Sequence, residues 1–175
     1  MMESKDYEFR LVERADELNL FEWRSDPVTV ARSLFPEPTQ DEHDAWMFRG
    51  VCDPRIKRVI YDEAYPQQFD GTTRMMSVGQ VTIRAYYGPA GDALQCPFQV
   101  GPAYRKQGVG TRMMTRLHGL LLGPRVAHVK PENEASRKIL AACGFVEIDP
   151  TELWDRYRFT VRDGLIGLFR DPNTQ

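Results

Sequence analysis

The chain has 175 residues, of which 42% are hydrophobic, and its formal net charge is −2. This is enough apolar sequence for a single domain with a buried core, expected to span residues 1–175. Without a block of Lys and Arg we expect no nucleic-acid surface, and without an apolar run near the roughly 20 residues of a membrane span we expect no membrane partner.

Cysteine usage and the start of the chain give no sign of export or of a metal site. The three cysteines, Cys52, Cys96 and Cys143, are odd in number and lack metal-ligand spacing. They are typical of reduced intracellular thiols, and no metal is expected. The charged N-terminal sequence lacks the apolar stretch of a signal peptide, which predicts a cytoplasmic protein.

The first ninety residues are predicted to contain one strand, three helices and then two strands. Asp26 before Pro27 indicates a helix start, because the carboxylate can cap the helix and proline tolerates its first turn. Thr39 and Glu42 have the spacing of a capping box. The predicted elements are a strand at Tyr7–Val12, helices beginning near Leu18, after Asp26 and after Thr39, strands at Arg58–Tyr61 and Met76–Tyr87, and a mobile loop at Tyr65–Thr73.

The second half alternates between strands and helices. A strand at Ala93–Val100 follows a five-residue hairpin loop, Gly88–Asp92. Pro97 lies inside this strand, and because proline cannot donate to a strand ladder it indicates a bulge, a splayed edge or an irregular strand start. The remaining predicted elements are a helix over residues 109–122, a strand at Val126–Val129, a helix at Ser136–Ala142, and strands at Val146–Ile148 and Leu153–Val161.

The segment Phe98–Thr111 is the most informative part of the sequence. A strand end runs into a loop containing Gly108 and Gly110, and a helix then begins. The first turn of a helix presents unpaired amides and the positive end of the helix dipole, which together favour an anion such as phosphate. Arg105 and Lys106 would add positive charge to this site.

Several uses of this loop can be weighed from the residues alone. A phosphate loop of the Gly-Lys-Ser/Thr type is excluded, because Thr111 and Arg112 follow Gly110. A dinucleotide loop, as in a nicotinamide-dependent oxidoreductase, would need glycine in place of Met113, although Glu132 lies at a suitable distance for a ribose-binding acid. The glycines could also serve only the geometry of a strand-to-helix turn.

Two segments of the chain carry a resemblance to a known family. The first is the string Val100-x-Pro102-x-Tyr104-Arg105-Lys106-Gln107-Gly108-Val109-Gly110-Thr111, and the second is Pro131–Ser136 followed by Cys143-Gly144-Phe145. Together they resemble the two acetyl-CoA-binding motifs of the GCN5-related N-acetyltransferase (GNAT) superfamily. They cover residues 98–145, a little over a quarter of the chain.

The resemblance implies an α+β acyl-CoA N-acyltransferase fold, with a mostly antiparallel twisted sheet of about seven strands that is flanked by helices and splayed around strands four and five. The predicted order of elements agrees with this fold and not with a doubly wound nucleotide fold. Residues 1–97 would supply the acceptor side, 98–145 the cofactor motifs and 146–175 the last strands. The resemblance further implies that acetyl-CoA, the co-substrate, is bound by Phe98, Val100, Arg105, Lys106, Gln107, Gly108, Val109, Gly110, Thr111, Asn133 and Ser136.

The implied reaction is direct transfer of an acetyl group to a primary amine in a ternary complex. It needs a proton acceptor for the amine, a hydrogen-bond donor for the carbonyl oxygen and one for the leaving thiolate. The resemblance places the oxygen's donor, a backbone N–H, within Phe98–Val100. Many members have tyrosine where this chain has Leu140, so Ser136 is compared with the serine of the ribosomal-protein N-terminal acetyltransferase branch. The alternative role of Ser136 is to cap its helix.

No residue is assigned firmly as the general base. His128 has a usable pKa range, but a single histidine on a strand is also commonly structural. Glu132 and His43 are further possibilities, and a chain of water molecules could replace all three.

A second resemblance, in the N-terminal third, suggests the amine acceptor. Trp23-Arg24-Ser25-Asp26-Pro27 and Glu42-His43-x-x-Trp46 resemble amino-sugar N-acetyltransferases of pseudaminic-acid-type synthesis. Arg24 and His43 would hydrogen-bond a nucleotide-linked amino sugar, and Trp23 or Trp46 would stack on a ring. The alternatives are a core role for Trp46, a peptide N-terminus, an antibiotic or a polyamine as acceptor, and an inactive CoA-binding module. We expect a monomer or a homodimer.

Overall fold

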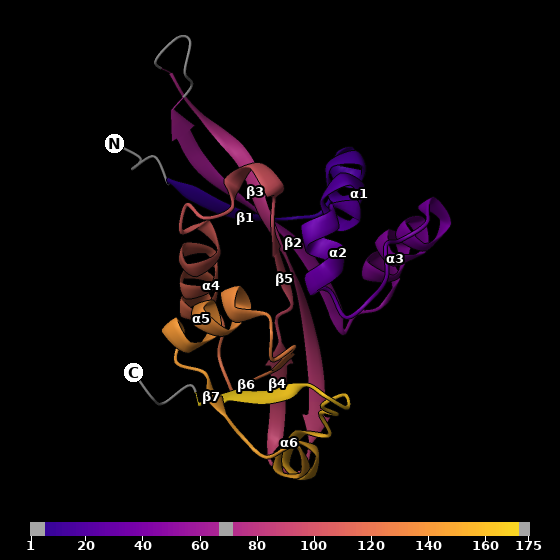
Figure 1. Cartoon of the computed structure of the whole chain (residues 1–175), viewed down its shortest axis with the longest axis vertical. Helices are drawn as coiled ribbons and strands as arrows, with labels where there is room; N and C mark the ends of the chain where they lie inside the picture. Colours follow the sequence, from indigo (N-terminus) through magenta and orange to yellow (C-terminus); the bar gives the residue numbers. More distant parts are fainter. Residues whose placement is uncertain (1–5, 67–71, 172–175) are drawn as a thin grey trace.

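An eight-stranded sheet forms the centre of the computed structural model, which describes residues 6–66 and 72–171 apart from the side chains of residues 50–52 and 66. The strand order is β1-β2-β3-β4-β6-β8-β7, and β5 pairs with β3. All pairs are antiparallel except β4 with β6. This arrangement confirms the mostly antiparallel α+β fold, with one strand more than the approximate seven (Figure 1).

The N-terminal elements follow their predicted starts closely. β1 spans Tyr7–Leu11, the short helix η1 spans Arg14–Asp16, and helices α1, α2 and α3 span Glu17–Ser25, Pro27–Arg32 and Gln40–Cys52. The Asp26 side chain accepts a hydrogen bond from the Thr29 N–H, at 2.9 Å. Thr39 and Glu42 form the reciprocal capping box. Both predicted helix starts are therefore confirmed.

The next two strands are longer than predicted. β2 spans Ile56–Pro66 and β3 spans Thr73–Gly88, so the centre of the predicted loop, residues 67–71, lies outside the described residues. β4 spans Gly91–Gln95, and Gly88 pairs directly with Gly91. The predicted five-residue loop is thus wrong: the hairpin closes in two residues, because the glycines themselves continue the ladder.

The predicted strand around Pro97 has an irregular centre but no bulge. β5 spans Phe98–Val100 and is followed by the short helix η2 at Pro102–Tyr104. Its register on β3 continues that of β4 without a shift, since Arg84 pairs with Gln95 and Val81 with Phe98. β6, at Arg125–Val129, pairs in parallel only with Leu94 and Gln95 of β4. The strands therefore diverge after Gln95, which confirms the predicted splay.

Helices cover both faces of the sheet (Figure 1). On one face, α4 (Val109–Leu120) and α5 (Glu134–Ala142) pack on the largest apolar cluster, which includes Val81, Met113 and Leu140. On the other face, α1 and α3 pack near Ile60, and α6 (Pro150–Tyr157) packs on Ala93 and Val126. Among residues 6–66 and 72–171, every helix is too short or too polar to cross a lipid bilayer.

The end of the chain differs from the prediction. β7 spans Val146–Glu147 as expected, but the predicted strand at Leu153–Val161 is wrong, because α6 occupies Pro150–Tyr157. The Asp149 side chain accepts a hydrogen bond from the Thr151 N–H at 2.7 Å, so Asp149 and Pro150 start this helix in the manner of Asp26 and Pro27. The last strand, β8, lies further on at Ile166–Arg170.

The last turns of α4 contain the buried His118 and contact the buried Arg125 of β6. The Arg125 side chain donates hydrogen bonds to the carbonyl oxygens of His118, Leu121 and Gly123, and so satisfies the last turn of the helix. The His118 ring lies 5.4 Å from that of Phe145. Burial and the nearby guanidinium of Arg125 lower the pKa of His118 from 6.5 to about 4.

This histidine should make stability depend on pH. Because its pKa is lower in the folded chain than in the unfolded chain, its stabilising effect is complete above pH 6.5 and lost as the pH falls toward 4, by up to about 3 kcal/mol. Urea unfolding at several pH values should show this loss in the wild type and a smaller loss in His118→Leu. Equal pH dependence in the two proteins would contradict the assignment.

Candidate functional site

The loop before α4 has the backbone geometry of an anion site. Lys106 and Gly108 both have positive φ angles, of 60° and 75°. The first hydrogen bond of α4 runs from the Arg112 N–H to the Gly108 carbonyl, at 3.1 Å. In the described part of the chain, the amides of residues 108–111 find no protein acceptor. Left-handed residues beside a helix N-terminus turn successive amides toward one point, which fits a phosphate group.

Gly108 and Gly110 are required at their positions for different physical reasons. Gly108 is exposed and adopts a left-handed conformation that other residues adopt only with strain. A Cβ atom on Gly110 would lie 2.7 Å from Cδ1 of Ile139 and 3.4 Å from Cγ2 of Val100. Gly110 thus lets α4 approach α5 and β5 closely, a packing role that the anion-site interpretation did not include.

Two arginines hold the loop from opposite sides. Arg105 donates to Asp26 and to the Thr29 hydroxyl, both at 2.7 Å, which fastens the loop to α2. Arg112 donates to Glu63 of β2, at 2.6 and 2.8 Å, and to the Gln107 carbonyl, at 2.8 Å. The Arg105 side chain is therefore engaged with α2 instead of adding free charge to the loop.

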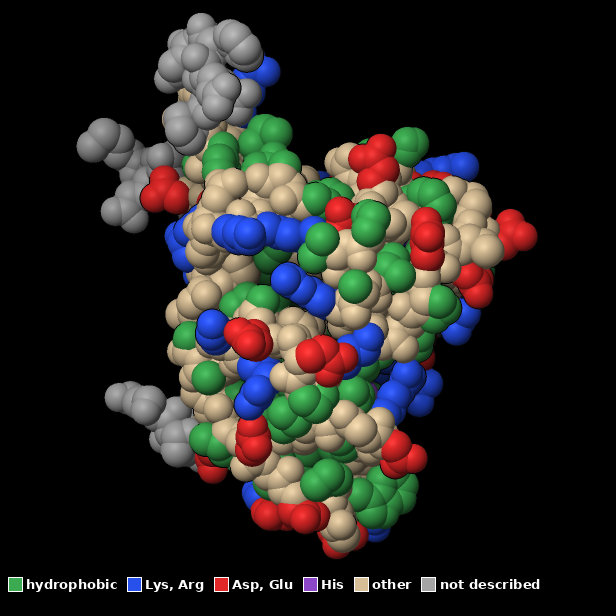
Figure 2. All heavy atoms as spheres, in the orientation of Figure 1, with side chains coloured by type: hydrophobic (Ala, Val, Ile, Leu, Met, Phe, Trp, Pro, Cys, Tyr) green, Lys and Arg blue, Asp and Glu red, His purple; other side chains and the backbone are tan. Residues whose placement is uncertain are grey.

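Lys106 is exposed and lies two residues before Gly108, the N-cap of α4. Figure 2 shows Lys and Arg side chains gathered on this face of the molecule, where α4 begins beside the α1 and α2 helices.

Because β5 diverges from β6, one backbone edge of β5 has no strand partner among the residues that the structure describes. The Thr82 N–H donates to the Pro97 carbonyl and the Gly101 N–H donates to the Val78 carbonyl, both at 2.9 Å. Because backbone groups alternate along a strand, those of Phe98 and Val100 point away from β3, toward β6. An extended chain laid along β5 could pair with them.

The second motif lies at the start of α5. The side chain of Asn133 accepts a hydrogen bond from the Ser136 N–H, at 3.3 Å, and so Asn133 caps the helix. The alternative that Ser136 is the cap is wrong, because it lies in the first turn with its side chain half-buried. Leu140 points into the core and has no polar role.

A group of buried and half-buried polar side chains lies on the sheet face opposite α4 and α5. The strand register places Arg58 beside Thr82, Gln80 beside Gln99, and Arg84 beside Gln95. We call this group the polar sheet face; its members are Arg58, Gln80, Thr82, Arg84, Gln95, Gln99 and His128. None of these seven residues is acidic. Sequence reasoning missed all but His128 as a group, although polar residues alternate with apolar ones along residues 80–84.

His128 is the possible base that the structure places on this face. Its Nε2 atom lies 3.5 Å from Nε2 of Gln95, and its ring lies 5.2 Å from that of Phe159. Burial and the cations of Arg162 and Arg84 lower the pKa of His128, which keeps the ring neutral at neutral pH. Glu132 is instead exposed in the turn before α5.

The predicted acceptor residues mostly form a buried stack. The His43 side chain is 0% exposed, and its ring lies 5.2 Å from Phe21 and 5.6 Å from Trp46. Its Nδ1 accepts a hydrogen bond from Arg24, at 2.9 Å, because guanidinium groups only donate. The prediction that His43 contacts an acceptor, or acts as its base, is therefore wrong.

The two tryptophans are also in contact with the chain itself. Trp23 is buried, and a Cβ atom on Gly101 would lie 2.9 Å from its ring. The guanidinium carbons of Arg24 and Arg58 lie 4.5 and 4.1 Å from the centre of the Trp46 ring. The stacking that was predicted for a sugar ring is thus made by histidine and arginine side chains, and the core role of Trp46 is confirmed.

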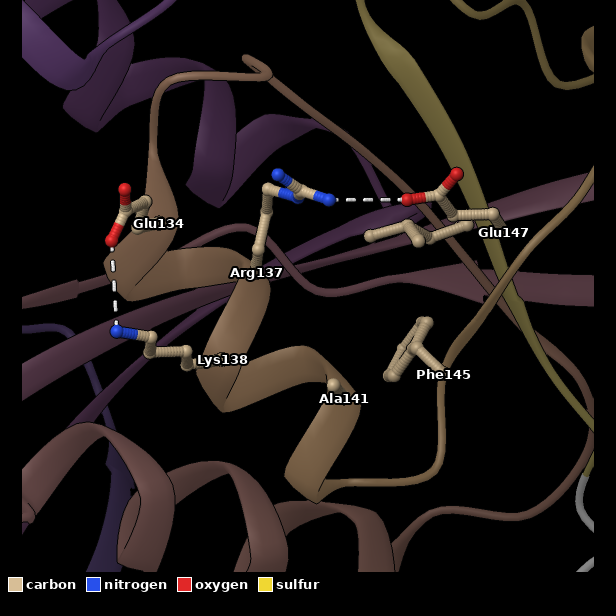
Figure 3. A pocket seen from close by; sticks show the side chains of 7 residues that line it. Glu134, Arg137, Lys138, Ala141, Phe145 and Glu147 are labelled. Carbon is tan, nitrogen blue, oxygen red and sulfur yellow. Dashed lines mark hydrogen bonds and ion pairs between the residues drawn. The ribbon is translucent and has the colours of Figure 1, made fainter.

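A separate groove lies on the outer side of α5 (Figure 3). It is lined by Glu134, Arg137, Lys138, Ala141, Phe145, Glu147 and Leu168. Its charges pair with one another, since Lys138 lies 3.6 Å from Glu134 and Arg137 lies 3.3 Å from Glu147. Ile139, which approaches Gly110, is not among these residues, so the groove is not part of the loop site.

Comparisons with known proteins show the family and the fold of the chain. The acetyltransferase (GNAT) domain family matches residues 7–146. A spermidine N-acetyltransferase from Vibrio cholerae, in complex with CoA and spermine, has a TM-score of 0.71 at 16% identity, with 97% of each chain covered.

Two further solved structures are similar. An aminoglycoside acetyltransferase in complex with coenzyme A has a TM-score of 0.69 at 14% identity, with 94% of each chain covered. A domain from Methanocaldococcus jannaschii has a TM-score of 0.68 at 16% identity, with 94% of this chain and 97% of that chain covered. At these identities the likeness establishes the fold. No curated protein sequence gives a significant match.

The packing role of Gly110 can be tested within one helix. Gly119→Ala should raise the free energy of unfolding by about 0.5–1 kcal/mol, because that glycine lies in α4 with open space around it and alanine favours a helix. Gly110→Ala should raise it less or lower it, because the added methyl group forces the end of the Ile139 side chain to shift. Urea unfolding measures both. Equal stabilisation by the two alanines would exclude the packing role of Gly110.

The buried position of His43 gives a second prediction. His43→Ala should lower the free energy of unfolding by about 2 kcal/mol, because the ring contacts with Phe21 and Trp46 are lost. The Kd for acetyl-CoA, measured by isothermal titration, should be unchanged. If His43→Ala left the free energy of unfolding unchanged and weakened acceptor binding, His43 would be an acceptor-binding residue and not a structural one.

Proposed function

The chain belongs to the acetyltransferase (GNAT) domain family and is an acetyl-CoA-dependent N-acetyltransferase; on that premise we propose that its acceptor is a small molecule with a primary amine, specifically a nucleotide-linked amino sugar. The observation that carries this choice of acceptor is the polar sheet face, which has cationic and amide side chains but no acidic residue.

The cofactor residues divide between the loop and the strand edge. Acetyl-CoA supplies an activated thioester and has phosphates at the other end of the molecule. The unpaired amides of residues 108–111 and the Lys106 side chain would hold the phosphates. The free backbone groups of Phe98 and Val100 would pair with the extended arm, and Asn133 and Ser136 would lie near its end.

The amine would approach from the polar sheet face. The opposite face near β5 is filled by α4, α5 and their apolar contacts, including Phe98 and Val100 themselves. His128 is half-buried on the face opposite α4 and α5 and is neutral, so it could accept the amine proton directly or through water. A backbone N–H of β5 would stabilise the developing oxyanion, and the Ser136 hydroxyl would donate to the leaving thiolate.

The charge of the polar sheet face favours some amines over others. The similar solved structures include one with spermine and enzymes that act on aminoglycosides, which are polycations. Here Arg58 and Arg84 lie on the sheet face, and an additional positive charge beside them would be repelled. An amine that also carries negative charge, as a nucleotide-linked amino sugar does, is compatible with both arginines.

A peptide N-terminus is the second acceptor under consideration. It rests on the Asn133-x-x-Ser136 pattern with Leu140, which resembles the ribosomal-protein N-terminal acetyltransferase branch. A peptide acceptor gives no reason for the arginines of the polar sheet face.

A thiol-release assay with acetyl-CoA tests the acceptor. We expect turnover with UDP-linked amino sugars and little or none with N-terminal peptides, polyamines or aminoglycosides at equal concentration. Turnover of peptides without turnover of the sugars would support the second acceptor instead. Preference for a polyamine would overturn the argument from charge.

The role of His128 can be tested by the pH dependence of kcat/KM. If the reaction needs both a neutral amine and a neutral His128, a plot of log kcat/KM against pH has a limiting slope of two at pH values below both pKa values. His128 contributes below pH 6.5, because its pKa is lowered. In His128→Gln the slope should fall to one and the rate by about 100-fold or more. A slope that stays at two would exclude His128 as the proton acceptor.

A further inference from the structure

Arg58 is a buried cation that forms no ion pair with any residue in the described part of the chain. Its side chain projects from β2 onto the polar sheet face, and the residue is 5% exposed. Its Nε and Nη1 atoms are buried and have no hydrogen-bond partner among the described residues. A buried guanidinium normally has a carboxylate or several carbonyl groups around it, because the cost of desolvating an unpaired charge is large.

The groups around Arg58 increase this cost. Arg24 and Arg58 both lie over the Trp46 ring, and the Nε atom of Arg84 is also buried without a partner in the described structure. Burial and the charges of Arg84, Arg24 and Arg49 lower the pKa of Arg58 to about 10. The ring of Trp46 attracts cations, but it supplies no acceptor for the unpaired N–H groups.

The acidic groups near this cluster are bound elsewhere. Glu42 is the acid whose charge acts on Arg24, and its carboxylate accepts hydrogen bonds from Thr39 at 2.9 and 3.1 Å. Asp26 is held by Arg105. Asp53, the acid whose charge interacts with that of Arg84, is held by Arg55 at 2.9 and 3.0 Å. The positive charges of Arg24, Arg58 and Arg84 therefore converge on one side of the sheet, and none of them forms an ion pair with another described residue.

The cluster lies on the same side of the sheet as the proposed reaction centre. Arg84 pairs across the strands with Gln95, which in turn lies 3.5 Å from His128. A ligand that contacts the arginines with one end can therefore present its other end toward His128 and the free edge of β5.

We propose that Arg58, together with Arg24 and Arg84, binds a phosphate group of the acceptor. The proposal rests on the proposed function, because it assigns the arginines to the acceptor and not to acetyl-CoA. Phosphate oxygens accept several hydrogen bonds at once and match guanidinium donors well. The unpaired N–H groups of Arg58 and Arg84 would gain partners, and the repulsion between the arginines would be relieved.

Binding of a diphosphate to the CoA-saturated protein tests this site directly. With the loop before α4 occupied by CoA, isothermal titration with UDP should show one further site, and uridine should show none. Arg58→Gln and Arg84→Gln should each weaken UDP binding at least about tenfold, since charged hydrogen bonds are lost. Lys57→Gln is the matched control: Lys57 is exposed and precedes Arg58 on β2, so UDP binding should be unchanged.

Thermal unfolding separates binding from a structural role. Arg58→Gln should not lower Tm in the absence of anions, because it removes an unpaired buried charge. A lower Tm with unchanged UDP affinity would show that Arg58 is structural and would overturn the proposal, as would the absence of any UDP site in the CoA-saturated wild type. Inorganic phosphate, titrated in parallel, should bind more weakly than UDP; equal affinity would indicate a site for free phosphate and contradict an acceptor site.

The two proposals can fail separately. UDP binding that depends on Arg58, without turnover of any amino sugar, would retain the phosphate site and exclude the amino-sugar acceptor. If Arg58→Gln turned over an amino sugar with the KM of the wild type, the amino-sugar acceptor would be retained and the phosphate site at Arg58 would be excluded.

Discussion

The divergence of two strands after Gln95 is the constraint on which the rest of the site depends. β5 keeps the register of β4 on β3, so it cannot follow β6, which turns away to pair with β8. Pro97 contributes its carbonyl to β3 but has no N–H, which makes this the natural point of irregularity. The free backbone edge at Phe98 and Val100 points toward β6, directly before the loop that leads into α4. One break in the sheet therefore sets the strand edge and the helix N-terminus side by side.

In this site the side chains fix the loop in place, and the backbone amides supply much of the hydrogen bonding that is proposed for the cofactor. Arg105, which was assigned to phosphate binding from the sequence, instead fixes the loop to α2, and Arg112 fixes it to Glu63. Gly110 is needed for helix packing and Gly108 for its left-handed backbone. The amides are thus held in place before a ligand arrives, and a preorganised donor set loses less entropy on binding. Charge on the opposite face comes from arginines that strand pairing brings together.

Local signals in the sequence predicted the fold well, and long-range contacts limited the prediction of the site. The helix caps, the glycine loop and the splayed strand follow from short-range chemistry. The α6 helix was missed because the apolar spacing of residues 153–161 also suits a strand, although Asp149 and Pro150 repeat an earlier helix start. His43 was assigned to the acceptor because no sequence pattern shows that Phe21 and Trp46 enclose it. Arg58 became visible only when strand register placed it among other cations.

Amide hydrogen exchange with and without acetyl-CoA tests the central claim, that the diverging strand edge and the helix start form one cofactor site. Saturating acetyl-CoA should slow exchange of the amides of residues 108–111, and those of Phe98 and Val100. The amide of Gln99, which faces β3, should change little. Equal protection of all three β5 amides, or protection confined to the groove beside Arg137 and Glu147, would contradict the account.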